Sequence, residues 1–256
     1  MDKAVERAIK CIWERYSEPL SLTEIAGSAL LSRFYFARVF RAVTGVTPGR
    51  FLAAVRIYQA KRMLLSTSMT ITYISFAVGY NSIGSFTNYF TQSVGVSPSR
   101  FRHMSRNEGF GLPRPERNPP SAHGAVAGTI SLPEGHAGAC VYVGAFKTPI
   151  LQHRPATAVI ADVAGGRPST YRLPDVPEGT WFVHAVGAGD SASPEPWTRR
   201  TLVVGGHNPV TVTAGTVTGA AVRLRPSRPA DPPILLALPD LERRAWRSGI
   251  HRWRCC

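Results

Sequence analysis

One 16-residue pattern occurs twice in this chain, fifty positions apart. Residues 36–51 read FARVFRAVTGVTPGRF, and residues 86–101 read FTNYFTQSVGVSPSRF. Seven of the sixteen positions are identical, namely Phe36/Phe86, Phe40/Phe90, Gly45/Gly95, Val46/Val96, Pro48/Pro98, Arg50/Arg100 and Phe51/Phe101. This repetition predicts that the first 105 residues contain the same small structural unit twice.

Capping and turn residues indicate that the repeated unit is helical. Four residues are placed to cap the first turns of helices, namely Ser21, Thr47, Thr70 and Ser97. Two of them are followed by proline, which favours the first helical position, in Thr47-Pro48 and Ser97-Pro98. Gly45 and Gly95 are placed to end the helices that carry the repeated phenylalanines, and Ser82 or Ser85 starts the second of these helices. Each copy therefore predicts a short helix, a tight turn and a second helix, which is a helix-turn-helix unit.

The spacing of apolar residues predicts which side chains are buried. In the first copy Phe36, Val39, Phe40 and Val43 fall on one helical face, so we expect all four in a core. The connecting helix runs from Thr47 to about Leu65, and 18–20 residues span roughly 27–30 Å. Successive major grooves on one face of B-DNA are about 34 Å apart, so this spacer has the reach to place two helices in two grooves.

The charge distribution favours nucleic acid as the partner. The chain carries a net charge of +14, and residues 25–107 contain ten Lys/Arg and no Asp or Glu. A long segment with one sign of charge produces a sustained positive field that suits a polyanion. A membrane role is disfavoured because no run of about 18 apolar residues occurs. Four scattered cysteines predict neither a disulfide framework nor a zinc site, which favours the cytoplasm.

Three stretches carry a resemblance to a known family. They are SRFYFARVFRAVTGVTPGRFL, then Arg56 and Ala60 in R-x-x-x-A with Leu64-Leu65, then VGYNSIGSFTNYFTQSVGVSPSRFR. In this order and spacing, residues 1–105 resemble the DNA-binding domain of the AraC/XylS family of transcription regulators. The resemblance implies sequence-specific promoter binding and, in most members, activation of transcription.

The resemblance also implies which residues read DNA. Aligned with the family's motif, the base-reading positions are Arg33, Phe34, Tyr35, Ala37 and Arg38 in the first unit and Ile83, Gly84, Ser85 and Asn88 in the second. Arg38 has the donors to pair with guanine, and Asn88 can pair with adenine. Many relatives have arginine where Asn88 stands, so the second reading helix of this chain is unusually uncharged. The expected phosphate-binding residues are Arg41, Arg50, Arg100 and Arg102.

Composition changes after residue 107. We expect domain 1–107 for DNA binding, a proline-rich linker at 108–123, a β-sandwich at 124–226, and a tail at 227–256 that is first proline-rich and then Arg/Trp-rich. Seven or eight short segments with period-two alternation predict antiparallel strands in this third region. The entry pattern from Pro177 to Ala185 is similar to transthyretin-like modules of the carboxypeptidase regulatory type. The expected fold is thus an all-α double helix-turn-helix domain followed by an all-β antiparallel sandwich.

Motifs that would indicate an enzyme lack their required context. Residues 187–192 fit G-x-G-x-x-A, but Pro194 and Pro196 exclude a following helix, so we expect a loop. Asp190-Ser191 lacks the flanking glycines of a nucleophile elbow. The seven histidines show no ligand spacing for a metal. We therefore expect no catalytic site, no cofactor and no metal.

These observations predict a transcription regulator that reads a bipartite site on double-stranded DNA. The family resemblance implies that it is an activator. RNA polymerase is the expected protein partner, and the sandwich is expected to bind a small-molecule effector or mediate self-association. Two alternatives stay open. One is an architectural DNA-binding protein without sequence preference, and the other is a ligand- or glycan-binding sandwich tethered to DNA.

Overall fold

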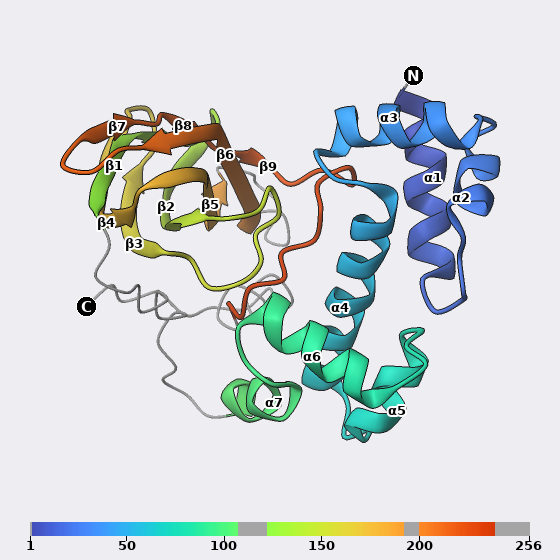
Figure 1. Cartoon of the computed structure of the whole chain (residues 1–256). Helices are drawn as coiled ribbons and strands as arrows, with labels where there is room; N and C mark the ends of the chain where they lie inside the picture. Colours follow the sequence, from blue (N-terminus) through green and yellow to red (C-terminus); the bar gives the residue numbers. More distant parts are fainter. Residues whose placement is uncertain (1, 107–121, 192–199, 239–256) are drawn as a thin grey trace. The chain divides into compact units, whose positions relative to one another are not determined.

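The structure is a computed structural model that describes residues 2–106, 122–191 and 200–238 (Figure 1). It divides into two compact units. Unit 1 is Met1–Gly111 with two later segments, Pro149–His153 and Arg228–Ala237, and unit 2 holds the remaining residues. Most of the expected linker at 108–123 and the Arg/Trp-rich part of the tail lie outside the described residues.

Unit 1 is built from seven helices in its described part (Figure 1). They are α1 (Asp2–Arg15), α2 (Leu22–Ser28), α3 (Arg33–Thr44), α4 (Pro48–Ser66), α5 (Ile71–Ala77), α6 (Ile83–Val94) and α7 (Pro98–Arg106). The pair α2 and α3 forms the first helix-turn-helix unit, and α5 and α6 form the second. Helix α4 has 19 residues and connects them, which confirms the expected helical architecture.

Capping residues that the sequence predicts determine where these helices begin. Ser21 and Glu24 form a complete capping box, and hydrogen bonds from Ser21 lower the pKa of Glu24. Ser82, rather than Ser85, is the N-cap of α6, since its hydroxyl accepts the backbone N–H of Ser85. Ser32 occupies the N-cap position of α3 without a side-chain capping bond. The duplicated units therefore differ in how their second helices, α3 and α6, begin.

The repeated phenylalanines form the same aromatic triad in each half of unit 1. In the first half, ring centroids are 5.3 Å apart for Phe36 and Phe40 and 5.5 Å apart for Phe40 and Phe51. In the second half, the matching separations are 5.6 Å for Phe86–Phe90 and 5.8 Å for Phe90–Phe101. All six side chains are fully buried. The identical positions of the repeat are thus the positions that build its two cores.

One residue of the expected core is on the surface. Val43 is 40% exposed, whereas the next residue, Thr44, is buried. The Thr44 hydroxyl donates to the Phe40 carbonyl at 2.8 Å, and the same oxygen accepts the N–H of Val46. The expectation for Val43 was wrong because, at the end of α3, the polar Thr44 completes the turn and takes the inward position.

Unit 2 consists of two β-sheets. Its strands are β1 (His123–Ser131), β2 (His136–Phe146), β3 (Thr157–Ala164), β4 (Ser169–Pro177), β5 (Gly179–Ser191), β6 (Arg200–Val212), β7 (Val217–Gly219), β8 (Val222–Arg223) and β9 (Arg225–Pro226). One sheet has the order β4-β1-β7, with β8 also on β1, and the other has the order β3-β2-β5-β6-β9. The expected antiparallel pairing is confirmed, and β1 adds two short parallel pairings with β7 and β8.

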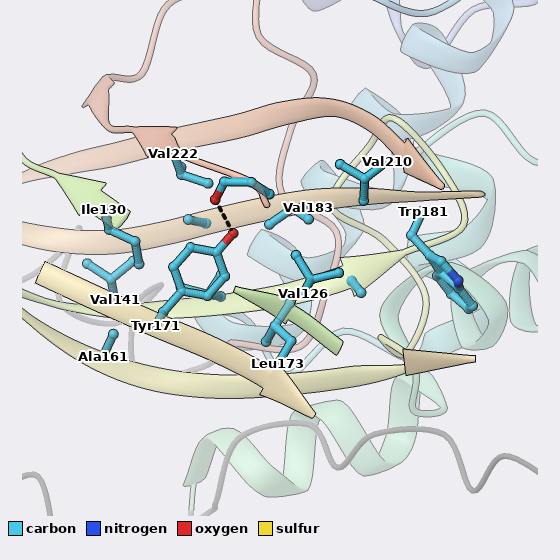
Figure 2. Packing of buried hydrophobic residues seen from close by; sticks show 14 of the residues in the cluster. Val126, Ile130, Val141, Ala161, Tyr171, Leu173, Trp181, Val183, Val210 and Val222 are labelled. Atoms are coloured by element: carbon cyan, nitrogen blue, oxygen red, sulfur yellow. Dashed lines mark hydrogen bonds between the residues drawn. The ribbon is translucent and has the colours of Figure 1, made fainter. Parts of the chain in front are cut away.

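A single hydrophobic cluster draws on both sheets of unit 2 (Figure 2). Val126 and Leu173 come from the first sheet, and Val141 and Val183 come from the second. Tyr171 lies in this cluster and donates its hydroxyl to the Ala220 carbonyl at 2.6 Å, while burial raises the pKa of Tyr171 to about 12. The polar end of the one tyrosine in the cluster is thus satisfied by the backbone.

The G-x-G-x-x-A segment is not a loop in its described part. Residues 187–191 continue β5, where Ala188 pairs with Cys140 and Gly187 pairs with Val141 of β2. The expectation of a loop was wrong because the proline residues that suggested it begin only after the strand has ended. A Cβ at Gly187 would lie 2.8 Å from the Cys140 carbonyl, so this glycine serves close strand packing.

Lowering the pH is expected to destabilise unit 2 through His184. This side chain lies against the rings of Phe146 and Phe182 and donates Nε2–H to the Thr148 carbonyl at 3.0 Å. Burial lowers the pKa of His184 below its ordinary value of 6.5. The unfolded chain therefore binds more protons at acid pH, and stability present above pH 6.5 is lost as the pH falls through the folded pKa, by at most about 1.4 kcal/mol per pH unit.

Urea denaturation of the protein and of a His184→Gln variant, each at pH 7.5 and pH 5.5, measures this effect. The variant should show the smaller difference between the two pH values. An equal difference in both proteins would rule His184 out as its source.

In the described ranges, none of the helices combines the length and the apolar composition needed to cross a membrane. No group of three or more His, Cys, Asp or Glu residues gathers into a metal-binding arrangement in the same part of the chain.

Candidate nucleic-acid interface

The second helix of each helix-turn-helix unit presents a row of exposed side chains. On α3, Phe34 is 79% exposed and Tyr35 is 41% exposed, although both are aromatic. On α6, Ile83 is 43% exposed, and Asn88 is exposed one turn further along. Phe36 and Phe86, on the opposite faces of these helices, are buried. One face of each helix is therefore packed in the core, and the opposite face is exposed.

All nine predicted base-reading residues lie on these two helices. Eight of them are exposed, and Ala37 is partly buried; the exposed ones are Arg33, Phe34, Tyr35, Arg38, Ile83, Gly84, Ser85 and Asn88. They occur at the start and in the middle of each helix, which are the parts of a recognition helix that enter the major groove in helix-turn-helix proteins. Their role in reading bases remains a prediction.

Arginines and aromatic rings are paired on the outer face of α3. The Cζ of Arg33 lies 4.8 Å from the centroid of the Phe34 ring, and the Cζ of Arg38 lies 5.3 Å from the centroid of the Tyr35 ring. Such cation–π contacts restrict an arginine while leaving its edge donors accessible. Helix α3 thus presents guanidinium groups that are partly ordered by neighbouring rings.

The corresponding face of α6 carries no charged residue. Its exposed groups are the apolar Ile83, the backbone at Gly84, the Ser85 hydroxyl and the Asn88 amide. Ser85 Oγ is 3.0 Å from Ser82 Oγ, so the cap and the reading face are linked by a hydrogen bond. This chemistry suits van der Waals contact with thymine methyl groups and a bidentate amide contact with adenine.

Of the predicted phosphate-binding residues, Arg41, Arg50 and Arg100 are exposed. Arg102 is only half-exposed, and its Nη2 donates to the Met69 carbonyl at the entrance to α5. This contact gives Arg102 a place in the fold that the sequence did not indicate. Its contact with phosphate stays a prediction.

Two further basic residues, on α4, are used inside the fold. Arg56 donates Nε to the Tyr16 carbonyl at 2.8 Å and Nη2 to the Glu18 carbonyl at 2.7 Å, and burial lowers its pKa. Lys61 is 1% exposed. Helical spacing could have identified Lys61, because it lies four residues after Ile57 and three before Leu64, both of which are buried.

Gly79, in the turn before α6, is held close to the first half of unit 1. Its φ is +87°, and a Cβ at this position would lie 2.8 Å from the Ser17 carbonyl oxygen and 3.1 Å from Cζ of Arg56. Gly45 has a similar φ of +77° but no atom within 4 Å of an added Cβ. The two glycines therefore separate the effect of backbone conformation from the effect of crowding.

Gly79→Ala is expected to destabilise unit 1 more than Gly45→Ala. The left-handed conformation costs a non-glycine residue about 1–2 kcal/mol, which applies to both variants. Only Gly79→Ala also pushes against a backbone carbonyl. Thermal unfolding followed by the helical circular dichroism signal compares the two directly, and equal losses would show that the close approach at Gly79 is not strained.

Comparison with known proteins finds relatives of the helical region of this chain. A family model described as a helix-turn-helix domain matches residues 25–104. The lactose operon transcription activator of Staphylococcus xylosus is 28% identical over 103 residues, or 40% of this chain and 37% of the relative. The bifunctional transcriptional activator/DNA repair enzyme AdaA of Bacillus subtilis is 30% identical over 104 residues, or 41% of this chain and 49% of the relative. The matches thus span less than half the length of these relatives.

Two solved structures are also similar to part of this chain. The DNA-binding domain of AdpA in complex with a target DNA has 26% identity and a TM-score of 0.39, covering 40% of this chain and 92% of that one. An AraC-type regulator from Chromobacterium violaceum has 25% identity and a TM-score of 0.41, covering 42% and 96%. By the family model, residues 25–104 of this chain are a helix-turn-helix domain, and an AraC-type regulator is among the proteins to which the chain is similar.

Proposed function

We propose that this protein is a sequence-specific transcription regulator that binds a bipartite promoter site with α3 and α6 in successive major grooves. The observation that carries the proposal is that the same helix-turn-helix unit occurs twice, with the same buried phenylalanines but different exposed residues. Identical phenylalanines bury the inner faces of both helices, whereas the outer faces differ at most positions. Two helix-turn-helix units whose exposed faces differ suit a DNA site made of two different half-sites.

The length of α4 supports two-groove binding. A helix of 19 residues is about 28 Å long, which is close to the separation of about 34 Å between successive major grooves. The absence of Asp and Glu from residues 25–107 supports DNA as the partner. Exposed arginines on this unit would displace counterions from phosphate groups, so binding should weaken as salt concentration rises.

The proposal includes activation of transcription, which two relatives suggest, and RNA polymerase is then the proposed protein partner. The lactose operon transcription activator and the bifunctional transcriptional activator AdaA carry this activity in their names. Unit 2 is proposed to serve effector binding or self-association, because it has its own core apart from the DNA-binding unit.

Selection from a random duplex library by the full chain, at near-physiological salt, tests this function. Enrichment of two short motifs about one helical turn apart is the expected result. Enrichment of one motif would mean that α6 holds DNA without reading it. Tight binding without enrichment would favour the architectural alternative, and thermal-shift screening for ligands of the full chain addresses the ligand-binding alternative.

Matched variants then assign roles to side chains. Arg38→Ala and Asn88→Ala should each relax preference in one motif, since a bidentate base contact contributes about 1–3 kcal/mol of discrimination. Arg41→Ala is the control, because loss of a phosphate contact weakens binding to all sequences alike and lowers the salt dependence. Unchanged discrimination by both reading-helix variants would contradict the assignment.

A further inference from the structure

Two segments from beyond the AraC-type domain pack inside unit 1. They are Pro149–His153, which follows β2 along the chain, and Arg228–Ala237, which follows β9. We call the two segments together the brace. The backbone N–H groups of Leu235 and Leu236 both donate to the Leu151 carbonyl, at 3.0 and 3.1 Å, so the segments are bonded to each other. In Figure 1 the red trace after β9 runs beside α4 toward α6.

The brace contributes side chains to both cores of unit 1. Ile150 is 3% exposed and belongs to the cluster of the first helix-turn-helix unit, where Ala230 also packs. Leu235 and Ala237 are buried in the cluster of the second helix-turn-helix unit. The brace therefore contacts the two halves that α4 connects.

The brace also caps the second reading helix. The last carbonyls of a helix have no partner within the helix. At the end of α6, the His153 backbone N–H donates to the Ser93 carbonyl at 2.8 Å, and its Nδ1 donates to the Gln92 carbonyl at 2.6 Å. The Ala237 N–H donates to the Val94 carbonyl at 3.1 Å. Three successive carbonyls of α6 are thus held by the brace.

Lys61 joins the brace to the connecting helix. Its Nζ lies 3.1 Å from the Ile234 carbonyl and 3.0 Å from the carbonyls of both Leu235 and Leu236. A carbonyl accepts and never donates, and only an ammonium group has three N–H donors, so this geometry requires the charged form of Lys61. The Phe101 ring of α7, 5.5 Å away, faces the same charge. Burial of this charge is compensated by backbone atoms that the brace supplies.

We propose that the brace sets the separation and orientation of the two reading helices, and thereby decides which spacing between half-sites the protein accepts. Long helices curve, and their curvature depends on what packs against them, so elements that contact both halves influence how the two ends of α4 are related. An element that packs into both cores, caps α6 and holds Lys61 constrains this relation. The proposal rests on the bipartite binding proposed above and adds a device that fixes its geometry.

The first test needs no DNA. Spin labels are placed at Arg41→Cys on α3 and Thr91→Cys on α6, which are exposed and equivalent in the repeat, with Cys11, Cys140, Cys255 and Cys256 changed to serine. Pulsed electron resonance then measures the distance between the two helices. A single narrow distribution is expected in this background, and a broader or shifted one after His153→Ala or Lys61→Met. His153→Ala keeps the test decisive if Lys61→Met unfolds the unit.

His136→Ala is the matched control. Its ring also faces a backbone carbonyl, that of Glu134 at 3.4 Å, but within unit 2. It should leave the distribution between α3 and α6 unchanged. A folded His153→Ala protein with the same narrow distribution as the background would overturn the proposal.

The second test measures spacing on DNA. Full-length protein is titrated with the selected duplex and with versions whose half-sites are moved by one or two base pairs. The unmodified chain should lose at least about tenfold in affinity per altered spacing, whereas His153→Ala should lose less than about threefold, with its affinity for an isolated half-site unchanged. Identical spacing profiles in the two proteins would contradict the role in specificity. Failure of the chain to select any paired motif would reject the bipartite function instead, and the distance measurement would still decide on the brace.

Discussion

Replacing Phe90 by alanine is expected to lower the free energy of unfolding of unit 1 by about 3–5 kcal/mol, the range found when large aromatic side chains are removed from cores. Phe90 is fully buried between Phe86 and Phe101. Phe40→Ala should cost a similar amount, because Phe40 has the same position between Phe36 and Phe51. Urea denaturation followed at 222 nm measures both, since the helices of the described residues belong to unit 1.

Phe34→Ala is the matched control for this pair. It removes the same side chain from α3, but the ring is 79% exposed, so the expected change in stability is within about 0.5 kcal/mol. Under the proposed function, this variant alters DNA selection instead. A loss in Phe40→Ala or Phe90→Ala no larger than the loss in Phe34→Ala would show that the aromatic triads do not organise the two halves.

The repeat predicted the two helix-turn-helix units correctly because their folding depends on local signals. Capping residues, glycine stops and apolar spacing act within a few positions of one another, and Thr47, Thr70 and Gly45 all behave as expected. Val43 was misplaced because a helical pattern does not show where the last turn is completed by a hydroxyl such as that of Thr44.

The exposed faces of α3 and α6 could be located from sequence, since exposure follows from the same periodicity that buries Phe36 and Phe86. The brace could not. Its contacts join residues more than 170 positions apart, as between Lys61 and Leu235, and nothing in local composition distinguishes a proline-rich tail from a segment that packs. The expected boundary of the DNA-binding region at residue 107 accordingly did not include Pro149–His153 or Arg228–Ala237.

The charges of α4 illustrate why single residues are hard to assign from sequence. The ten Lys/Arg in residues 25–107, with no Asp or Glu, predicted a sustained positive field. Arg56 and Lys61 instead direct their donors to backbone carbonyls within unit 1. Fewer than the ten basic residues therefore contribute charge at the surface, and the exposed ones include Arg38 and Arg41.

Lys61→Met is expected to lower the free energy of unfolding of unit 1 by about 2–4 kcal/mol, because it leaves the buried carbonyls of the brace without donors while filling nearly the same space. An unpartnered buried polar group costs about 1–3 kcal/mol, and three carbonyls depend on this ammonium group. Arg62→Met, at the neighbouring exposed position, controls for the loss of a positive charge and should change stability by no more than about 0.5 kcal/mol.

Amide hydrogen exchange distinguishes this account from a general loosening. In Lys61→Met the amides of Leu235, Leu236 and Ala237 should exchange faster, because they belong to the segment that Lys61 holds. The amides in the core of the first helix-turn-helix unit should remain protected for longer. Unchanged exchange at these amides together with unchanged stability would mean that water replaces the ammonium group without cost, and that Lys61 does not secure the brace. Faster exchange confined to them would show that one side chain of the connecting helix holds the segment that caps α6.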